Sequence, residues 1–282
     1  MSLVSTASLV DEAVARKAAV AAFNVITLEH AEAIVAGAEA AQRAVILQIS
    51  QNAARFHHGQ LRPMARAAAA VAELSTVDVS LHLDHVTDVE LLHQATDAGF
   101  SSVMFDAAET SYRDNVAATT AAAQWAHVTG LWVEAELGHV GGKGNTVADA
   151  HTAGTRTDPD EAAAYVAACG VDALAVAVGS SHAMTSRSAR LDLALIHAIA
   201  AKVAVPLVLH GSSGVPDHDL RAAAGAGMRK INVGTALNVA YTGALRTYLA
   251  ENPDATDPRP YLSLARTDMA RTVTALIRVI SG

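Results

Sequence analysis

Three histidines each follow a short apolar run, and this placement suggests a metal site. They are His85, His182 and His210. Neutral imidazole is the commonest protein ligand for zinc, and three ligands with an open fourth position are typical of a catalytic zinc site. Cys169 is the single cysteine, which excludes a cysteine-based zinc site within the chain. If the three runs are neighbouring parallel strands, the imidazoles meet at one edge of the sheet.

Other polar side chains end the remaining apolar runs. These side chains are Asn24, Ser50, Asp84, Asp106, Glu136 and Asn232. Any one of them, taken alone, is most often an ordinary loop residue. Three histidines and three carboxylates at one rim favour a functional site instead, because barrel enzymes carry their chemistry at the carboxyl ends of strands.

The lysines argue against imine chemistry. Lys17, Lys202 and Lys230 stand before apolar runs and are expected at the opposite, structural end of the strands, whereas Lys143 lies in a long loop. A Schiff base needs a lysine that is desolvated within the site. We therefore expect a metal, rather than an imine, to serve as the electrophile.

The elements that must position these residues alternate along the chain. Short apolar runs predict strands at 20–25, 44–50, 79–85, 102–106, 131–138, 173–179, 206–211 and 230–235. Helical periodicity occupies 29–41, 60–74, 88–98, 111–128, 160–169, 191–201, 217–226 and 236–250, and a further amphipathic segment spans 261–280. This pattern predicts an α/β fold, a single (β/α)8 TIM barrel over 1–282 with an extra C-terminal helix. A doubly wound sheet with a dinucleotide site would carry GxGxxG after its first strand, and that motif is missing.

Three loops have a composition that fits a binding role. The segments 210–214 and 232–235 follow the seventh and eighth strands, the usual phosphate site of this barrel. Their glycines allow close approach of the backbone, and the second segment leads into a helix N-terminus with unpaired N–H groups. The longest loop, 138–158, is glycine-rich and polar and is expected to be mobile.

Composition excludes several partners. Hydrophobic residues make up 51% of the 282 residues, and the formal net charge is −8. This charge argues against nucleic acid and acidic membrane surfaces as partners, but a small phosphate responds to local N–H groups. The N-terminal residues lack a signal-peptide pattern, and no uncharged run of 18 apolar residues occurs, so we expect a cytoplasmic location without membrane association.

At this point the motifs resemble a known family, the class II, zinc-dependent ketose-bisphosphate aldolases. In loop lengths the tagatose-bisphosphate branch is nearest, and the resemblance covers essentially the whole chain. The motifs that carry it lie at 81–85 (LHLDH), 133–138 (VEAELG), 175–182 (AVAVGSSH), 207–214 (LVLHGSSG) and 231–235 (INVGT).

The resemblance implies a role for each matching residue. His85, His182 and His210 would hold the catalytic zinc, and Asp84 would donate and accept the proton. The residues implied to touch substrate or its phosphate are Asn24, Ser50, Ala183, Gly211, Ser212, Ser213, Asn232, Val233, Gly234 and Thr235. Asp106 and Glu136 match residues that in some members hold a second or displaced metal. The implied cofactor is zinc, with a monovalent cation allowed beside it, the implied partner is a small phosphorylated sugar, and the implied assembly is a homodimer or homotetramer.

Departures from the family pattern leave the substrate open. Ala183 stands where members usually have glycine, and the segment 141–146 lacks the usual glutamate, for which Asp149 and His151 are substitutes. Gly234 and Asn238 replace an aspartate and an arginine that are common in fructose-bisphosphate enzymes. Four kinds of substrate therefore fit the sequence: tagatose bisphosphate, fructose bisphosphate, another phosphorylated ketose or a phosphorylated keto-acid.

Two other classes compete with an aldolase. An amidohydrolase-type barrel requires His-x-His at the end of the first strand, where this chain has Phe23 and Asn24. A non-catalytic, carbohydrate-binding derivative is compatible with the missing loop glutamate and with Ala183. Intact Asp84 and the three histidines favour the enzyme, and zinc analysis of the purified protein distinguishes the two.

Overall fold

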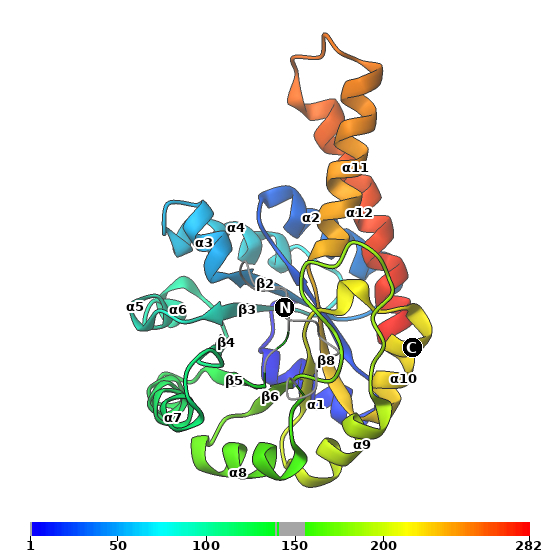
Figure 1. Cartoon of the computed structure of the whole chain (residues 1–282). Coiled ribbons are helices and arrows are strands. Elements are labelled where there is room, and N and C mark those ends of the chain that lie inside the picture. Colours follow the sequence, from blue (N-terminus) through cyan, green and yellow to red (C-terminus); the bar gives the residue numbers. More distant parts are fainter. Residues whose placement is uncertain (1, 139, 141–155) are drawn as a thin grey trace.

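The fold is a closed barrel of eight parallel strands paired in sequence order, with β8 returning to pair with β1 (Figure 1). The computed structural model describes residues 2–138, 140 and 156–282. The strands are β1 (Val20–Asn24), β2 (Val45–Ser50), β3 (Val79–Val86), β4 (Ser102–Phe105), β5 (Trp132–Leu137), β6 (Ala173–Val176), β7 (Leu207–Leu209) and β8 (Met228–Val233). The TIM barrel predicted from the apolar runs is confirmed.

Helices surround the barrel and follow most of the predicted segments. They are α1 (Thr6–Ala15), α2 (Leu28–Ala41), α3 (Gln51–Phe56), α4 (Leu61–Glu73), α5 (Val89–Leu92), α6 (Ala95–Ala98), α7 (Tyr112–Val128), α8 (Pro159–Cys169), α9 (Leu193–Lys202), α10 (Asp217–Ala226), α11 (Thr235–Glu251) and α12 (Pro258–Ile280). The segment expected as one helix at 88–98 divides into α5 and α6. The helices α1 and α3 were not predicted. Periodicity is a weak signal over the six residues of α3, whereas α1 precedes the first strand and lies outside the strand–helix alternation on which the prediction was built.

The amino-terminal end of the barrel is closed by α1. Its apolar residues Leu9 and Val10 pack with Val20 and Ile46 in a small cluster of buried side chains. Thr6, at the start of the helix, donates a hydrogen bond from Oγ1 to Ser80 Oγ in β3 (3.1 Å). The opposite, carboxyl end of the barrel is therefore the end that remains for a substrate.

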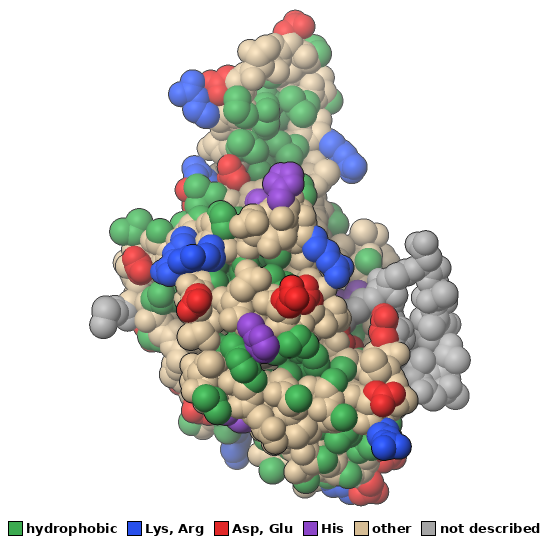
Figure 2. Space-filling model, turned by 90° about the vertical axis from the view of Figure 1, so that its left-hand side faces the viewer, with side chains coloured by type: hydrophobic (Ala, Val, Ile, Leu, Met, Phe, Trp, Pro, Cys, Tyr) green, Lys and Arg blue, Asp and Glu red, His purple; other side chains and the backbone are tan. Residues whose placement is uncertain are grey.

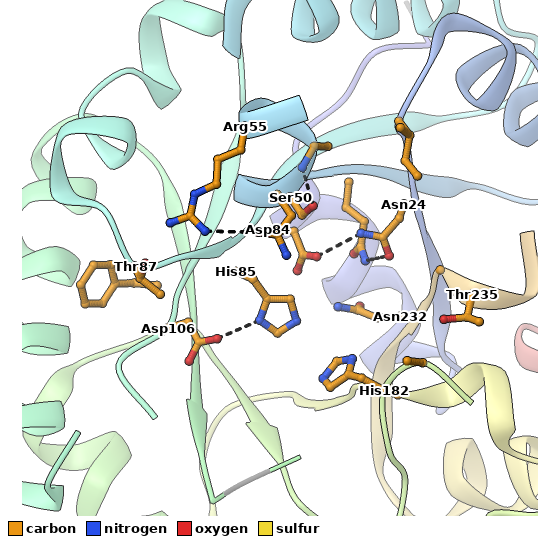
Figure 3. Close-up of a pocket in the computed structure, with 18 of the residues that line it drawn as sticks. Asn24, Ser50, Arg55, Asp84, His85, Thr87, Asp106, His182, Asn232 and Thr235 are labelled. Atoms are coloured by element: carbon orange, nitrogen blue, oxygen red, sulfur yellow. Dashed lines mark hydrogen bonds and ion pairs between the residues drawn. The ribbon is translucent and has the colours of Figure 1, made fainter. Parts of the chain in front are cut away.

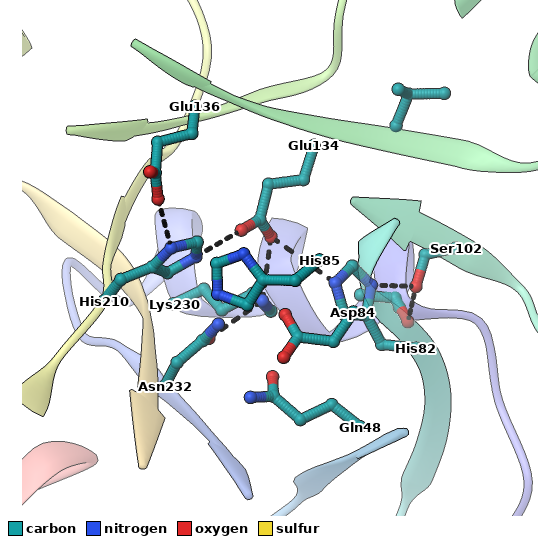
Figure 4. A network of polar contacts seen from close by, with 12 residues as sticks. Gln48, His82, Asp84, His85, Ser102, Glu134, Glu136, His210, Lys230 and Asn232 are labelled. Carbon is teal, nitrogen blue, oxygen red and sulfur yellow. Dashed lines mark hydrogen bonds and ion pairs between the residues drawn. The ribbon is translucent and has the colours of Figure 1, made fainter. Parts of the chain in front are cut away.

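Charged and polar side chains fill part of the barrel interior. His82 of β3, Glu134 of β5 and Lys230 of β8 are all fully buried there (Figure 4). The expectation that Lys230 lies at the structural end of its strand was wrong. The strand begins two residues earlier, at Met228, and alternation along it turns Lys230 into the barrel.

The helices α11 and α12 form a hairpin whose outer part projects from the barrel, while the C-terminal half of α12 packs on α2 with Met269, Val273 and Ile277 in the main core (Figure 1). Of the seventeen residues of α11, only Leu237 is buried. Val239, Leu249 and Leu264 of this hairpin are exposed, and hydrophobic side chains gather along it (Figure 2). None of the described helices is both long enough and apolar enough to cross a membrane.

The long loop at 138–158 falls almost entirely outside the described residues. Lys143, Asp149 and His151, which the sequence placed in that loop, lie outside them as well.

Candidate active site

A cavity of about 1200 Å³ opens at the carboxyl end of the barrel. Most of the residues predicted for the site line it, as Figure 3 shows for those that it labels. These are Asn24, Ser50, Asp84, His85, Asp106, His182, Ala183, Gly211, Ser212, Ser213, Asn232, Gly234 and Thr235. The structure therefore brings together residues from all parts of the chain at one rim.

Three predicted site residues do not line this cavity. His210 and Glu136 are buried just beneath its floor, in contact with each other. The side chain of Val233 packs among the apolar residues of the main core, so only its backbone can approach a ligand.

The three histidines converge. His85, His182 and His210 each offer one ring nitrogen, and these nitrogens lie within 4.8 Å of one another. Three atoms so spaced share a point no more than about 2.8 Å from each, and zinc–nitrogen bonds of about 2.0–2.1 Å require only a small inward movement of the rings. The three side chains therefore fit a three-histidine metal site.

A bulge in β3 allows two consecutive residues to face the site. The register between β3 and β4 shifts between Leu83 and Val86, and His85 has a positive φ of 50°. In regular strands neighbouring side chains point to opposite faces. The left-handed backbone at His85 breaks that alternation, so Asp84 and His85 both reach the rim (Figure 3).

Carboxylates contact two of the candidate ligand histidines. Asp106 Oδ2 accepts a hydrogen bond from Nδ1 of His85 (3.0 Å). The ring of His210 lies between two glutamates, with Nδ1 2.7 Å from Glu136 Oε2 and Nε2 2.8 Å from Glu134 Oε1. Such partners fix the orientation and the protonated nitrogen of a metal-binding histidine.

The charges around these groups shift their pKa values in opposite directions. Burial acts to lower the pKa of His210, but its hydrogen bonds to Glu134 and Glu136 outweigh burial and raise the pKa to about 9. Burial acts to raise the pKa of Asp84, but the positive charges of His85, Lys230 and other neighbours outweigh it and lower the pKa to about 2. Asp84 is therefore a carboxylate at neutral pH.

The amide of Asn24 holds Asp84, and the amide of Gln48 holds Asn24 in turn. Asn24 donates from Nδ2 to Asp84 Oδ2 (3.2 Å), and Gln48 donates from Nε2 to Asn24 Oδ1 (3.0 Å). Among the described residues, Asp84 Oδ1 has no hydrogen-bond partner. One oxygen is thus fixed while the other remains for a ligand.

Two glycines allow the loops after β7 and β8 to approach their neighbours closely. Gly211 has a φ of 66°, and a Cβ there would lie 2.6 Å from the backbone carbon of Ser181. A Cβ at Gly234 would lie 2.8 Å from Asn24 Oδ1. The hydroxyl of Ser213 accepts a hydrogen bond from the backbone N–H of Ala236, in the first turn of α11 (3.0 Å).

The region around His182 is less regular than expected. The strand β6 ends at Val176, so His182 lies in the following loop rather than directly at the end of the strand. Ala183 adopts a left-handed conformation with a φ of 59°. Glycine adopts this conformation without a steric penalty, whereas alanine does not.

Sequence reasoning missed several residues that contact the site. His82, Glu134 and Lys230 belong to a buried network around His210 (Figure 4), whereas Gln48 and Arg55 line the cavity. A usable signal was present for Glu134, which lies two residues before Glu136. In a buried strand that spacing places both carboxylates on the same face.

Comparison with known proteins agrees with this geometry. The model of the family "Fructose-bisphosphate aldolase class-II" matches residues 4–282. The chain belongs to the class II fructose-bisphosphate aldolase family. A fructose-bisphosphate aldolase of Geobacillus stearothermophilus is 38% identical over 279 residues, which cover 99% of this chain and 96% of that protein. A probable fructose-bisphosphate aldolase of Bacillus subtilis is 37% identical, with 99% and 97% covered.

Solved structures show the same fold. The YdjI aldolase of Escherichia coli K12 superposes with a TM-score of 0.85 at 29% identity, covering 99% of this chain and 97% of that one. A fructose-bisphosphate aldolase of Campylobacter jejuni superposes with a TM-score of 0.82 at 22% identity. The protein is therefore a class II aldolase, a carbon–carbon lyase, and the resemblance seen in its motifs is confirmed.

Proposed function

We propose that the protein is a zinc-dependent aldolase that cleaves and forms a tagatose- or fructose-1,6-bisphosphate type of ketose, with dihydroxyacetone phosphate as one product. The observation that carries the proposal is the convergence of His85, His182 and His210 beside a cavity that Asp84 also lines. Another phosphorylated ketose or a phosphorylated keto-acid remains the alternative substrate.

His85, His182 and His210 are the residues that would hold zinc. When bound, zinc supplies a Lewis acid that stabilises negative charge on the oxygen atoms of the three-carbon half of the substrate. Asp106 orients His85, and Glu134 orients His210, by their hydrogen bonds. The carboxylates of Asp106 and Glu136 also suit a second or displaced metal position.

Asp84 would transfer the proton on the sugar oxygen. In cleavage it accepts the proton of the C4 hydroxyl as the C3–C4 bond breaks, C4 becomes an aldehyde carbon, and the bonding electrons remain on C3. In condensation the protonated Asp84 returns that proton to the new hydroxyl. The fixed Oδ2 supports this role, because it holds the carboxylate in place while Oδ1 faces the cavity.

The two ends of the substrate would meet different walls of the cavity. The phosphate of the dihydroxyacetone half suits two segments: Gly211 and Ser213 on one loop, and Gly234 and Thr235 at the start of α11. Both segments can offer backbone N–H groups to a phosphate, because glycine allows close approach and a helix N-terminus leaves N–H groups unpaired. We assign the second phosphate to the wall formed by α3. Arg55 is the one Lys or Arg side chain among the described residues that line the cavity.

Ser50, on the same wall of the cavity, also caps helix α3. Its Oγ accepts a hydrogen bond from the backbone N–H of Ala53 and thereby caps α3 (3.1 Å). The hydroxyl proton remains available to donate to a substrate oxygen, so Ser50 can contact the sugar without giving up the cap.

The test is a panel of phosphorylated ketoses assayed for release of dihydroxyacetone phosphate. We expect at least one ketose bisphosphate to be cleaved, zinc to copurify at one per chain, and a chelator to abolish activity until zinc is restored. Borohydride with substrate should leave the activity intact, because no lysine is among the described residues lining the cavity. Covalent trapping on lysine, or a zinc-free protein that binds sugars without cleaving them, would overturn the proposal.

We also propose that the chain forms a homodimer or homotetramer through the α11–α12 hairpin. The outer part of the hairpin projects from its own barrel, and the hairpin carries the exposed Val239, Leu249 and Leu264 (Figure 1 and Figure 2). A second copy presents the same side chains, so a two-fold contact covers both hairpins at once. Leu249→Glu with Leu264→Glu should lower the mass measured by light scattering, whereas Val128→Glu, also exposed, should leave it unchanged; a monomeric wild-type protein would refute the assembly.

A further inference from the structure

A lysine lies fully buried inside the barrel, beneath the candidate metal site. The Nζ of Lys230 is 2.8 Å from Glu134 Oε2 and 2.8 Å from Asn232 Oδ1 (Figure 4). All three side chains are nine-tenths or more buried. Taking an ammonium group out of water is costly unless it is paired. The two contacts of Lys230 therefore account for its presence there, and each constrains a different residue of the site.

The first contact acts through Glu134 on His210. While Oε2 of Glu134 faces Lys230, its Oε1 lies 2.8 Å from Nε2 of His210. A carboxylate can only accept hydrogen bonds, so Nε2 must carry the proton. The other nitrogen, Nδ1, faces Glu136, which lies two residues nearer the rim on the same strand. Without metal, Nδ1 also carries a proton, toward Glu136, and because this nitrogen lies on the rim side it is the one from which a metal can displace the proton.

The second contact orients the amide of Asn232. The oxygen and nitrogen of an amide are interchangeable in shape, and the hydrogen-bond partners decide which is which. The ammonium of Lys230 can only donate, so the atom beside it must be Oδ1. The Nδ2 group then points away, and it has no hydrogen-bond partner among the described residues although it is buried. Because Asn232 lines the cavity, this N–H group is available to a substrate oxygen.

We propose that the Lys230–Glu134 pair is a positioning device that sets two atoms of the site at once. It directs Nδ1 of His210 toward the metal and Nδ2 of Asn232 toward the substrate. The part of this inference that concerns Asn232 rests on the proposed aldolase function, because cleavage of the sugar develops the negative charge that the Asn232 N–H would stabilise. The part that concerns His210 requires only that a metal binds the histidines.

A purely structural role is the competing explanation. Buried ion pairs can often be replaced by neutral groups of similar volume without loss of stability. The double substitution Lys230→Met with Glu134→Gln separates the two explanations, because it removes both charges together. A glutamine amide can accept from Nε2 or donate to it, so it no longer dictates which nitrogen of His210 is protonated. Methionine offers Asn232 no donor, so the amide is free to turn.

We expect the double variant to unfold at a temperature near that of the wild-type protein but to bind zinc about 10- to 100-fold more weakly, measured by competition with a chelator. Its cobalt-substituted form should show an altered visible spectrum. At saturating zinc, kcat should fall by about 10²-fold, the usual effect of losing one donor to a developing charge, with a smaller change in KM. A stable double variant with wild-type zinc affinity and cobalt spectrum would overturn the proposal.

Single variants separate the effect of the Lys230–Asn232 contact on activity from the effect of the Lys230–Glu134 contact on zinc affinity. Asn232→Ala leaves the ion pair in place, so it should lose cleavage activity while retaining wild-type zinc affinity. Lys202→Met is the matched control, since Lys202 pairs with Asp160 on the outer helices and the same substitution there should change neither property. Equal zinc affinity in the Asn232 variant and the double variant would contradict the division of roles.

The wild-type protein offers a test that needs no variant. In the zinc-loaded protein, two-bond proton–nitrogen correlation spectra should show Nε2 of His210 protonated and Nδ1 bound to metal. The reverse assignment would refute the role of Glu134 even if the double variant fails to fold. Neither this measurement nor the zinc titration uses a sugar, so both decide the metal half of the inference even if no ketose bisphosphate is cleaved.

Discussion

Among the carboxylates at the rim, the contacts single out Asp84 for proton transfer. Asp106 and Glu136 each contact a ligand histidine. Asp84 instead accepts a hydrogen bond from the amide of Asn24 at Oδ2, and its Oδ1 has no hydrogen-bond partner in the part of the chain that the structure describes. A carboxylate held in this way can exchange a proton with substrate without disturbing the metal ligands.

Replacing Asp84 should separate proton transfer from metal binding. We expect Asp84→Ala to retain zinc while carbon–carbon cleavage falls by about 10²-fold or more. The variant should still exchange the C3 proton of dihydroxyacetone phosphate, because that step uses a different base. His85→Ala should lose zinc and both reactions together. Cleavage near the wild-type rate in Asp84→Ala would transfer the role to Asp106 or Glu136.

The raised pKa of His210 predicts how zinc affinity depends on pH. A pKa of about 9 means that both ring nitrogens of His210 carry a proton in the metal-free protein at neutral pH, and zinc must displace one of these two protons. Apparent zinc affinity should therefore rise about tenfold for each pH unit up to about pH 9 and then level off. Chelator competition at several pH values, corrected for the chelator's own protonation, measures this slope. A flat profile between pH 7 and pH 9 would contradict the assignment.

At the scale of elements, backbone conformation decides which residues face the site. His85 at the bulge of β3 and Ala183 after β6 both adopt positive φ, as does Gln42 at the C-terminal end of α2. For a residue with a Cβ, this conformation is unfavourable. Two of the five non-glycine residues with positive φ in the described part of the chain thus lie at the candidate site, where this conformation turns side chains or backbone toward the cavity.

Ala183→Gly tests the cost of alanine at this position. Glycine relieves the left-handed strain, so the free energy of unfolding should rise by about 0.5–1 kcal/mol, measured by denaturant titration. Removing the methyl group from the cavity wall should also lower KM for the phosphorylated substrate. Gln42→Gly is the matched control, because it relieves similar strain far from the site and should leave KM unchanged. An unchanged KM in Ala183→Gly would show that the methyl group does not crowd the phosphate.

At the scale of the whole molecule, the buried network makes stability depend on pH in two directions. Burial and the charge of Lys230 lower the pKa of His82 to about 3, whereas the pKa of His210 is raised to about 9. Both lie near 6.5 in an unfolded chain. The neutral His82 stabilises the fold above pH 6.5, and this contribution is lost as pH falls toward 3. The charged His210 stabilises it below pH 6.5, and that contribution is lost as pH rises toward 9.

The metal-free protein should therefore be most stable near pH 6.5. Stability should fall by roughly 3 kcal/mol on approaching pH 9, because the folded state loses the favoured proton of His210. Denaturant titrations of chelator-treated protein between pH 5 and pH 9 measure this curve. Zinc saturation is the control, since it removes the proton and should abolish the decline above pH 6.5. A steady rise in metal-free stability up to pH 9 would refute the charged state of His210.

The sequence by itself was enough for the barrel and for most of the rim. Eight apolar runs separated by helical periodicity predict β1–β8, because strands buried on both faces have continuous apolar sequences. Polar residues that end such runs must gather at one rim, since the strands are parallel. The family motifs then assign His85, His182, His210 and Asp84, and the structure brings all four together.

Only the tertiary structure decided how these residues are oriented. The bulge that turns both Asp84 and His85 inward depends on the register between β3 and β4, which no local pattern encodes. The place of Lys230 depends on where β8 begins, because a shift of one residue moves a side chain to the other face of a strand. Its contact with Glu134 joins residues 96 positions apart, and such pairing exists only once the barrel closes.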